Sequence, residues 1–400
     1  MSNASSLSIR LPGANRRLES YALRTAAPLV TAALNRPFTR IAYSAAHVVA
    51  DPFATVDPWV TAALDWDATI AYRQRLWSLG LGVAEAMDTA QRGMGLDWPT
   101  SLELIRRSLD AAHDHPGALV ASGCGTDQLD VNASTTVDDV IRAYEEQMEA
   151  IESLGGKLIV MASRALARVA MSAADYERVY DRILMQSKQP VVLHWLGDMF
   201  DPALAGYWGS ADVDTAMETA LGVIAANPGK VDGIKISLLD KDKEIAMRRR
   251  LPEGVRMYTG DDFNYAELIA GDGVGSAKNQ QHSDALLGIF DAIAPAASAA
   301  LAALSDGQVD RFHAILAPTV PLSRHIFQAP TRFYKTGIVF LAWLNGHQSN
   351  FTMVGGQQSA RSLGHFAEIF RLADAAGLIE QPELAVARMR HLLALHGIEG

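Results

Sequence analysis

A lysine near the end of a short predicted strand is the residue best suited to chemistry. It lies in Asn227–Ser237, where an Asn-Pro-Gly turn signal precedes a short predicted strand. Because side chains alternate along a strand, Lys235 and Gly233 share one face, while Ile234 and Ile236 share the other. If the isoleucines pack against helices, Lys235 points inward, where burial lowers the amine pKa and frees a nucleophile toward carbonyls. The alternative is a salt-bridged lysine at the mouth of the fold.

Eight short apolar segments, separated by helical stretches, set the context of this lysine. The repeated strand–helix order predicts a parallel sheet, and eight units with none left over predict closure into a (β/α)₈ TIM barrel. Active sites of such barrels lie at the carboxyl ends of the strands, where Lys235 falls. The predicted strands are 40–49, 82–88, 118–123, 157–163, 190–196, 231–237, 255–259 and 286–292.

The barrel is predicted to occupy residues 39–306 of the 400-residue chain. Residues 1–38 form an N-terminal extension that we expect to be partly helical. From about Gln308 the pattern is helical without strands, so residues 307–400 are predicted to be a helical extension packed on the barrel.

His194 is the candidate proton carrier. It alternates inward on its strand with Val192, and a histidine pKa near 7 suits a general acid or base. A hydrogen-bonded core histidine is the alternative. Arg92 and Arg164 follow the second and fourth strands, and either could pair bidentately with a carboxylate or phosphate, or remain a solvated loop residue.

Several oxygen-bearing side chains stand at other predicted strand ends. Asp88 ends the second strand, Asp261 and Asp262 end the seventh, and Asp291 ends the eighth. They could accept sugar hydroxyls, assist proton transfer or bind a metal, whereas the alternative for Asp261 and Asp262 is helix capping. Thr126, after the third strand, could bind substrate or cap the next segment. The polar insertion 278–282 is expected on the catalytic side, as a lid or a plain surface loop.

Composition narrows the function class. A net charge of −10 argues against general attraction to nucleic acid or anionic membranes, and no apolar run is long enough to span a bilayer. The single cysteine, Cys124, allows no intramolecular disulfide and suits a reducing cytoplasm. Its expected role is packing beside glycine. The first residues lack the pattern of a signal peptide, and no dinucleotide or phosphate-loop fingerprint is present.

The order of short motifs resembles the dihydrodipicolinate synthase / N-acetylneuraminate lyase family. In that family a strand ending Gly-Ile-Lys supplies a Schiff-base lysine, and a Ser-Gly-Asp-Asp-like segment follows. The likeness extends from about residue 40 to 380. It implies a class I aldolase or lyase with Lys235 as nucleophile, a 2-oxo acid or sugar-derived carbonyl substrate, no cofactor, and a homodimer or homotetramer. The matching segments are 51–53, 122–126, 190–194, 231–235, 258–262 and 331–344.

The departures from the family argue for a different substrate. Its Gly-Thr-Thr-Gly-Glu loop, which grips the pyruvate carboxylate, is replaced by 88–98. Its tyrosine at the end of the fourth strand is replaced by 161–164, and His194 stands where it has a second tyrosine. We therefore expect a divergent branch that performs neither dihydrodipicolinate synthesis nor sialate cleavage.

Two other hypotheses stay open at this point. The first is a metal-dependent barrel, such as a sugar isomerase or epimerase, with Asp88, His194 and Asp262 as ligands, although their spacing is not diagnostic. The second is a non-catalytic barrel that binds a small metabolite.

Overall fold

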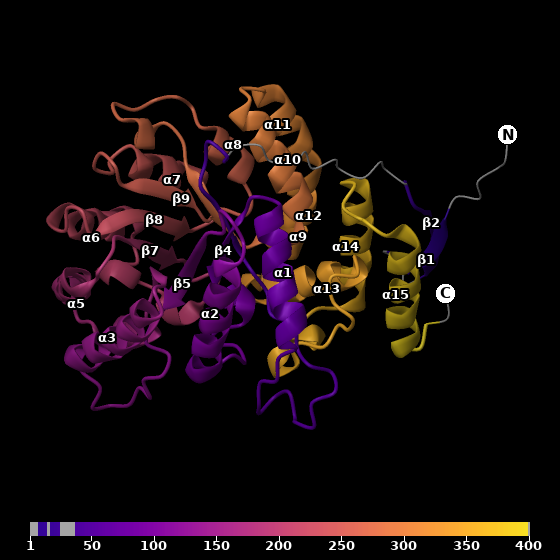
Figure 1. Ribbon diagram of the computed structural model, residues 1–400, viewed down its shortest axis with the longest axis horizontal. Coiled ribbons are helices and arrows are strands. Elements are labelled where there is room, and N and C mark those ends of the chain that lie inside the picture. The colour runs from indigo at the N-terminus through magenta and orange to yellow at the C-terminus, as the bar shows by residue number, and fades with distance from the viewer. Residues whose placement is uncertain (1–6, 14–16, 25–36, 399–400) are drawn as a thin grey trace.

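The computed structural model describes residues 7–13, 17–24 and 37–398. Eight parallel strands close into a barrel, with the last strand pairing with the first, so the predicted (β/α)₈ barrel is confirmed (Figure 1). The strands are β3 (Ala42–Ala45), β4 (Gly82–Glu85), β5 (Val120–Cys124), β6 (Lys157–Met161), β7 (Val191–Leu196), β8 (Val231–Ser237), β9 (Arg256–Thr259) and β10 (Asp284–Leu287).

Helices cover the outside of the barrel. A capping box of Thr136 and Asp139 opens α3, with both reciprocal hydrogen bonds present. The helices between and after the strands are α1 (Trp66–Ser78), α2 (Trp98–His113), α3 (Val137–Ser153), α4 (Arg164–Val169), α5 (Ala173–Gln186), α6 (Val213–Ala226), α7 (Lys241–Arg248), α8 (Tyr265–Ala270), α9 (Ile289–Ala292) and α10 (Ala294–Ser305).

Two apolar layers follow from the alternation of side chains along the strands. Ile234 and Ile236 join the layer between strands and helices. Tyr43, Ile159 and Tyr258 belong to a separate cluster inside the barrel. Gly233 makes room in this interior for the Tyr258 ring, since a Cβ there would lie 2.7 Å from Tyr258 Cε2.

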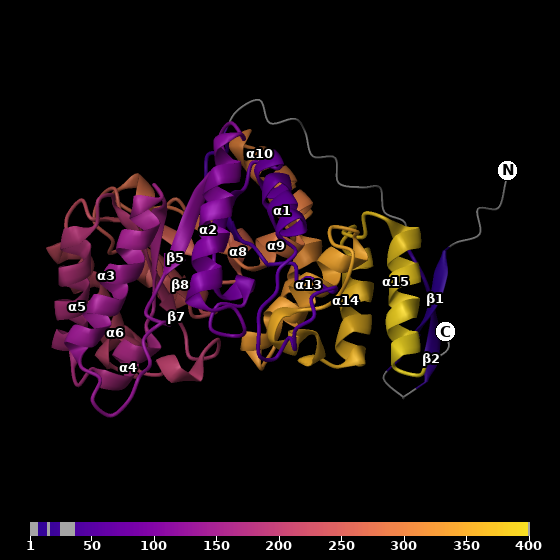
Figure 2. The same ribbon diagram turned by 60° about the horizontal axis from the view of Figure 1, so that its bottom comes forward.

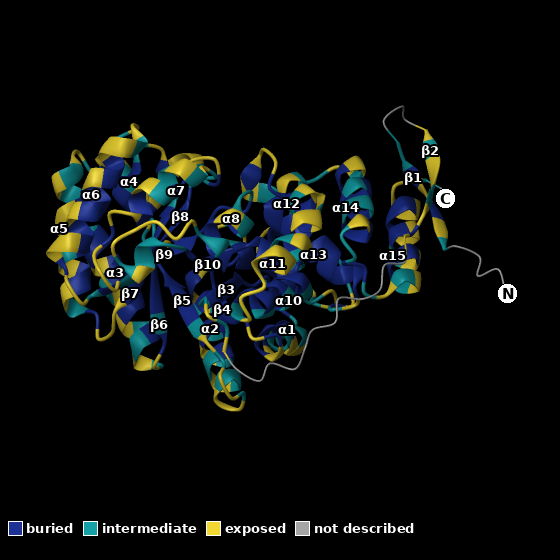
Figure 3. Ribbon diagram, turned by 90° about the horizontal axis from the view of Figure 1, so that it is seen from above, coloured by how far each residue is buried: buried dark blue, intermediate teal, exposed yellow. Residues whose placement is uncertain are grey.

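The remaining helices extend the molecule to one side. In Figures 1 and 2, α13, α14 and α15 succeed one another away from the barrel, and a two-stranded hairpin lies beyond them. One continuous apolar cluster joins barrel residues to these helices, and Figure 3 shows buried residues, in dark blue, throughout this junction. The helices are α11 (Val309–Leu316), α12 (Val320–Ile326), α13 (Tyr334–Leu344), α14 (Leu363–Ala375) and α15 (Pro382–Leu395).

The described part of the N-terminal extension is an antiparallel hairpin of β1 (Ser8–Pro12) and β2 (Leu18–Ala22). No helix occurs in 7–13 or 17–24, and residues 1–6, 14–16 and 25–36 lie outside the described residues, so the partly helical character of the extension stays a prediction. The hairpin is anchored on α14, because Tyr21 donates a hydrogen bond of 2.7 Å to Asp374 and Arg371 donates one of 2.8 Å to the Pro12 carbonyl. The boundaries at residues 38 and 306 stay predictions.

The eighth strand is shorter than predicted. β10 ends at Leu287, and the following residues turn into α9 because the Ile289 amide donates to Asp262 rather than continuing the ladder. Asp291 therefore lies on a helix and not at a strand end. It accepts hydrogen bonds from the backbone amide of His47 at 2.6 Å and from His47 Nδ1 at 2.8 Å, a buried structural pair.

The polar insertion lies at the opposite end of the barrel from the one expected. Residues 278–280 precede β10, and Asn279 Nδ2 donates to the carbonyls of Pro252 and Val255 just before β9. A segment that leads into parallel strands meets their amino ends, so this insertion is not a lid over the carboxyl ends. No helix among the described residues is long and apolar enough to cross a membrane.

A buried ion pair ties α1 to the outside of β4. Arg73 and Glu85 are fully buried, with Nε–Oε2 and Nη2–Oε1 distances of 2.9 Å. Ser108 donates to the same carboxylate at 2.5 Å. We predict that Glu85→Gln lowers the free energy of unfolding by about 3–5 kcal/mol, because it leaves the guanidinium buried without a counter-charge. Urea unfolding measures this change.

The matched control is Glu103→Gln on the exposed face of α2, where Glu103 pairs with Arg106 and Arg107 at helical spacing. Its loss should stay below about 1 kcal/mol, since exposed ion pairs contribute little. Equal losses for the two variants would contradict the role assigned to the buried pair.

Candidate active site

Lys235 points into the barrel near the carboxyl end of β8. Its residue is 6% exposed, and it is in register with His194 of the neighbouring β7. The predicted alternation is confirmed, because Ile234 and Ile236 face the helices. Among the described residues Lys235 has no hydrogen-bond partner. Burial lowers its pKa, against the opposing charges of Asp88 and Asp262, which favours a reactive amine.

A glycine beside the lysine explains part of the neighbouring motif. A Cβ at Gly260 would lie 2.8 Å from Lys235 Cε and 2.3 Å from Ser237 Oγ. Any larger residue at the end of β9 would therefore collide with the lysine side chain. Gly260 keeps the space through which Lys235 extends.

The two aspartates after Gly260 have different surroundings. Asp261 accepts hydrogen bonds from the amides of Phe263 and Asn264 at 2.8 and 3.0 Å, so it stabilises the loop. Asp262 is buried, and its Oδ1 accepts from the Ile289 amide at 2.8 Å. Burial raises the pKa of Asp262 to about 7, although the Ile289 amide and Lys235 oppose the rise. Asp262 is therefore a carboxyl group able to exchange a proton near neutral pH.

Asp88 is the second carboxylate near Lys235, in the 3₁₀ turn Asp88–Ala90 after β4. Its Oδ2 accepts a hydrogen bond of 2.9 Å from Tyr334, whose hydroxyl lies 2.6 Å from Thr89 Oγ1. Loss of hydration alone would raise the pKa of Asp88. The charges of Lys335 and Lys235 and the Tyr334 hydrogen bond outweigh that effect and hold this pKa below its usual value.

Tyr334 and Lys335 come from α13 of the C-terminal extension, and the sequence analysis did not identify either. Helix Tyr334–Leu344 is otherwise mostly apolar, as expected of a helix buried in the core. A usable signal was present, since Lys335 is the single charged residue in that helix.

His194 is held in its neutral form. Burial and the charge of Lys235 lower its pKa well below the usual value, although Asp88 acts in the opposite direction. The expectation of a pKa near 7 is therefore wrong. Nε2 lies 3.4 Å from Ser237 Oγ, and Nδ1 is buried without a partner in the described parts of the chain. A neutral imidazole here can hydrogen-bond a ligand.

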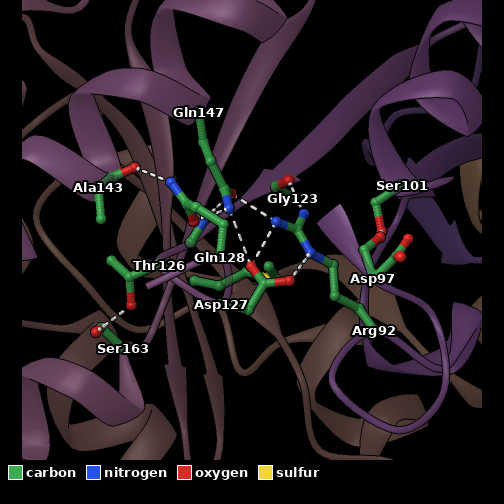
Figure 4. Close-up of polar contacts among 12 residues, drawn as sticks. Arg92, Asp97, Ser101, Gly123, Thr126, Asp127, Gln128, Ala143, Gln147 and Ser163 are labelled. Carbon is green, nitrogen blue, oxygen red and sulfur yellow. Dashed lines mark hydrogen bonds and ion pairs between the residues drawn. The ribbon is translucent and has the colours of Figure 1, made fainter. Parts of the chain in front are cut away.

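The guanidinium of Arg92 is hydrogen-bonded to other residues of the protein, as Figure 4 shows. Its guanidinium donates to Asp127 at 2.7 and 3.1 Å, to Gln147 at 2.5 Å and to the Gly123 carbonyl at 2.6 Å. Because all three nitrogens are engaged, Arg92 organises the loops after β4 and β5 and is not placed to grip a substrate anion.

Arg164 and Thr126 lie farther out. Arg164 forms an ion pair with Asp201, and its side chain is 47% exposed. Thr126 Oγ1 lies 2.6 Å from Ser163 Oγ, and Ser163 also caps α4 through the Leu166 amide (Figure 4). These hydroxyls and the ion pair form a polar rim.

A cavity of about 370 Å³ opens at this end of the barrel. Lys235 is not itself a lining residue, so a ligand reaches it past His194 and Asp88, which do line the cavity. The structure thus brings Lys235, His194, Asp88 and Asp262 together, whereas Arg92, Asp261 and Asp291 serve the scaffold. The polar lining includes Asp88, Thr126, Ser163, Arg164, His194 and Asp201.

Neither metal nor cysteine chemistry has the required geometry here. Within the described ranges, no group of three or more His, Cys, Asp or Glu side chains is arranged to hold a metal ion. The hypothetical ligand set Asp88, His194 and Asp262 is therefore not assembled as one. Cys124 is packed in the layer outside β5, where burial raises the pKa of its thiol to about 12.

Solved structures share this fold at low sequence identity. A prophage protein of the dihydrodipicolinic acid synthase family from E. coli K12, in complex with pyruvate, is 15% identical with a TM-score of 0.62; the match covers 85% of this chain and 99% of that one. Dihydrodipicolinate synthase DapA-2 from Bacillus anthracis is 14% identical, with a TM-score of 0.58 and coverage of 84% and 98%.

The 4-hydroxy-tetrahydrodipicolinate synthase from Methylacidiphilum fumariolicum SolV is 12% identical, with a TM-score of 0.60 and coverage of 88% and 99%. The resemblance seen in the motifs is thus confirmed at the level of the fold. No curated protein sequence matches the chain. A family model described as protein of unknown function (DUF993) matches residues 9–398, and the chain therefore belongs to the DUF993 family.

Proposed function

We propose that the chain is a class I aldolase or lyase in which Lys235 forms an imine with a 2-oxo acid or sugar-derived carbonyl compound. The observation that carries this proposal is a buried lysine without a hydrogen-bond partner among the described residues. It lies near the carboxyl end of the barrel, where the charges of Asp88 and Asp262 act on it. A fold alone does not decide a chemistry, so the proposal depends on this constellation.

The first step uses Lys235 in its neutral form. Nζ adds to the carbonyl carbon, and the resulting carbinolamine loses its oxygen as water. Asp262, with a pKa of about 7, supplies the additional proton that leaves a protonated imine. In carbon–carbon cleavage, the electron pair of the bond next to the imine forms an enamine double bond while the C=N pair moves onto the nitrogen. In dehydration, a carboxylate removes the proton from the carbon next to the imine to give the enamine, and the neighbouring hydroxyl, once protonated, then leaves as water with its electron pair. No bound cofactor is required.

Two neighbours would stabilise this intermediate. Asp88 is held ionised by Lys335, Lys235 and Tyr334, so it places a negative charge beside the iminium. His194, kept neutral, can donate or accept a hydrogen bond at the cavity wall. The hydroxyls of Thr126 and Ser163 suit polar groups farther along the substrate.

The substrate is expected to be a small polar carbonyl compound. A cavity of about 370 Å³ suits a molecule of that size, and one protein of the same fold was solved with pyruvate. A cytoplasmic location and assembly into a homo-oligomer are further parts of the proposal. They rest on composition and on the motif resemblance.

The direct test is trapping of the imine by borohydride. The protein is incubated with pyruvate, longer 2-oxo acids and sugar-derived ketones, reduced, digested and mapped by mass spectrometry. We expect a mass increase on Lys235 and at least a hundredfold loss of the adduct in Lys235→Ala, because the amine is removed.

Lys235→Arg is the matched variant, since it keeps a cation but cannot form the imine. An adduct that persists in both variants and maps to Lys335 would overturn the assignment of the nucleophile. Tight binding of a carbonyl compound without any adduct would instead favour a non-catalytic binding protein.

A second prediction concerns the pH dependence of stability. The pKa of Asp262 is raised in the folded protein from 3.8 to about 7, so the folded state holds a proton that the unfolded chain has released. The proton held by Asp262 stabilises the folded state at low pH. This stabilisation is lost as pH rises from about 4 to 7, by roughly 1.4 kcal/mol per pH unit.

Asp262→Asn removes that dependence while its side-chain oxygen can still accept from the Ile289 amide. Urea unfolding at pH 5, 6, 7 and 8 should show wild type losing stability relative to the variant up to about pH 7, and little further change above it. Parallel curves across this range would show that Asp262 is ionised throughout and is not the proton donor.

A further inference from the structure

Lys335 is a second buried amine at this end of the barrel. The residue is 1% exposed, and its side chain extends from α13 toward the loop after β4. Its Nζ lies 3.1 Å from Met94 Sδ and 5.3 Å from the centre of the Tyr334 ring. A thioether is only a weak acceptor, so in the described structure the ammonium lacks an oxygen acceptor within hydrogen-bond distance.

The charges around Lys335 do not fully compensate the positive charge of its ammonium group. It faces Asp88, Arg164 and Asp201, and Arg332 at the start of its own helix adds a cation. Arg164 and Asp201 already pair with each other. Asp88 is shared with Lys235 and is hydrogen-bonded by Tyr334. Burial lowers the pKa of Lys335 to about 8, which leaves it mostly protonated at neutral pH.

The other cations that could bind an anion here are already occupied. Arg92 donates to Asp127, Gln147 and a backbone carbonyl, and Arg164 is held by Asp201. Lys235 has to be neutral to attack a carbonyl. Arg332, just before α13, is exposed, so Lys335 is the buried cation at this end of the described barrel that is left for an incoming anion.

We propose that Lys335 binds the carboxylate of a 2-oxo acid whose keto carbon reacts with Lys235, so that the C-terminal extension selects anionic substrates. This inference rests on the proposed Schiff-base function. Met94 is half-buried, unbranched and flexible, so it can move aside for the carboxylate. A substrate carboxylate would give the buried Lys335 ammonium an oxygen acceptor of opposite charge, which a neutral ketone would not supply.

The test compares each acid with its neutral isostere. Rates of borohydride-trapped adduct on Lys235 are measured for pyruvate and 2-oxobutyrate and for their primary amides, in wild type, Lys335→Met, Lys335→Arg and Arg332→Met. The last variant removes a nearby exposed cation as a matched control. Thermal shifts with lactate and lactamide, which cannot form an imine, report carboxylate binding separately.

We expect wild type to prefer the acids over the amides by at least tenfold. Lys335→Met should lose that preference and the lactate shift, whereas Lys335→Arg and Arg332→Met should keep both.

If the adduct forms but the preference for acids is the same in Lys335→Met as in wild type, or if wild type prefers amides, the carboxylate site is wrong while the imine function stands. If no adduct forms with any carbonyl compound but lactate binding still requires Lys335, the imine function is wrong while the carboxylate site stands. A lactate shift that is absent from wild type, or unchanged in Lys335→Met, also counts against the site.

Discussion

The arrangement at the carboxyl end of the barrel depends on placing two amines around one carboxylate away from bulk water. An ammonium group loses much of its hydration on burial, and that loss is tolerable only beside an opposite charge or after deprotonation. Asp88 supplies the shared charge for Lys235 and Lys335, and Tyr334 and Thr89 fix its position. Lys235 is driven toward its neutral form by the same burial. Burial lowers the pKa of both amines, so the proposal of Lys235 as the reactive amine rests on its position on β8.

This arrangement makes the C-terminal extension part of the site. α13 carries Tyr334 and Lys335 at its first turn, and its other residues are buried among the barrel and the outer helices. The apolar packing of that helix therefore holds the polar pair in place. The N-terminal hairpin supports the same layer from outside through Tyr21 and Asp374. Packing far from the cavity thus helps to fix the positions of the Tyr334 and Lys335 side chains.

The barrel and the position of Lys235 could be predicted because both follow from local periodicity. Alternation along the strand placed Lys235 and His194 inward, and strand order placed Asp88 and Asp262 at the same end. The protonation of His194 could not be predicted, since its lowered pKa depends first on burial and then on the nearby charge of Lys235. The partners of Arg92 come from the loop and helix after β5, and the periodicity of the sequence could not predict these contacts either. The location of the insertion 278–282 was predictable, because a segment that leads into a parallel strand lies at the amino end.

Under the proposed function, Lys335 would take the role that a carboxylate-binding loop has in the dihydrodipicolinate synthase family, which this chain resembles in fold. The loop 88–98 is packed against the C-terminal extension. Gln91 Nε2 donates to the Val354 carbonyl at 2.5 Å, and a Cβ at Gly95 would lie 2.8 Å from Val354 Cγ1.

Met94 of the same loop touches Lys335. A loop held this closely by the extension has little freedom to wrap a carboxylate with its own backbone. Under the proposed function, the extension that restricts this loop would also supply the anion-binding cation, Lys335.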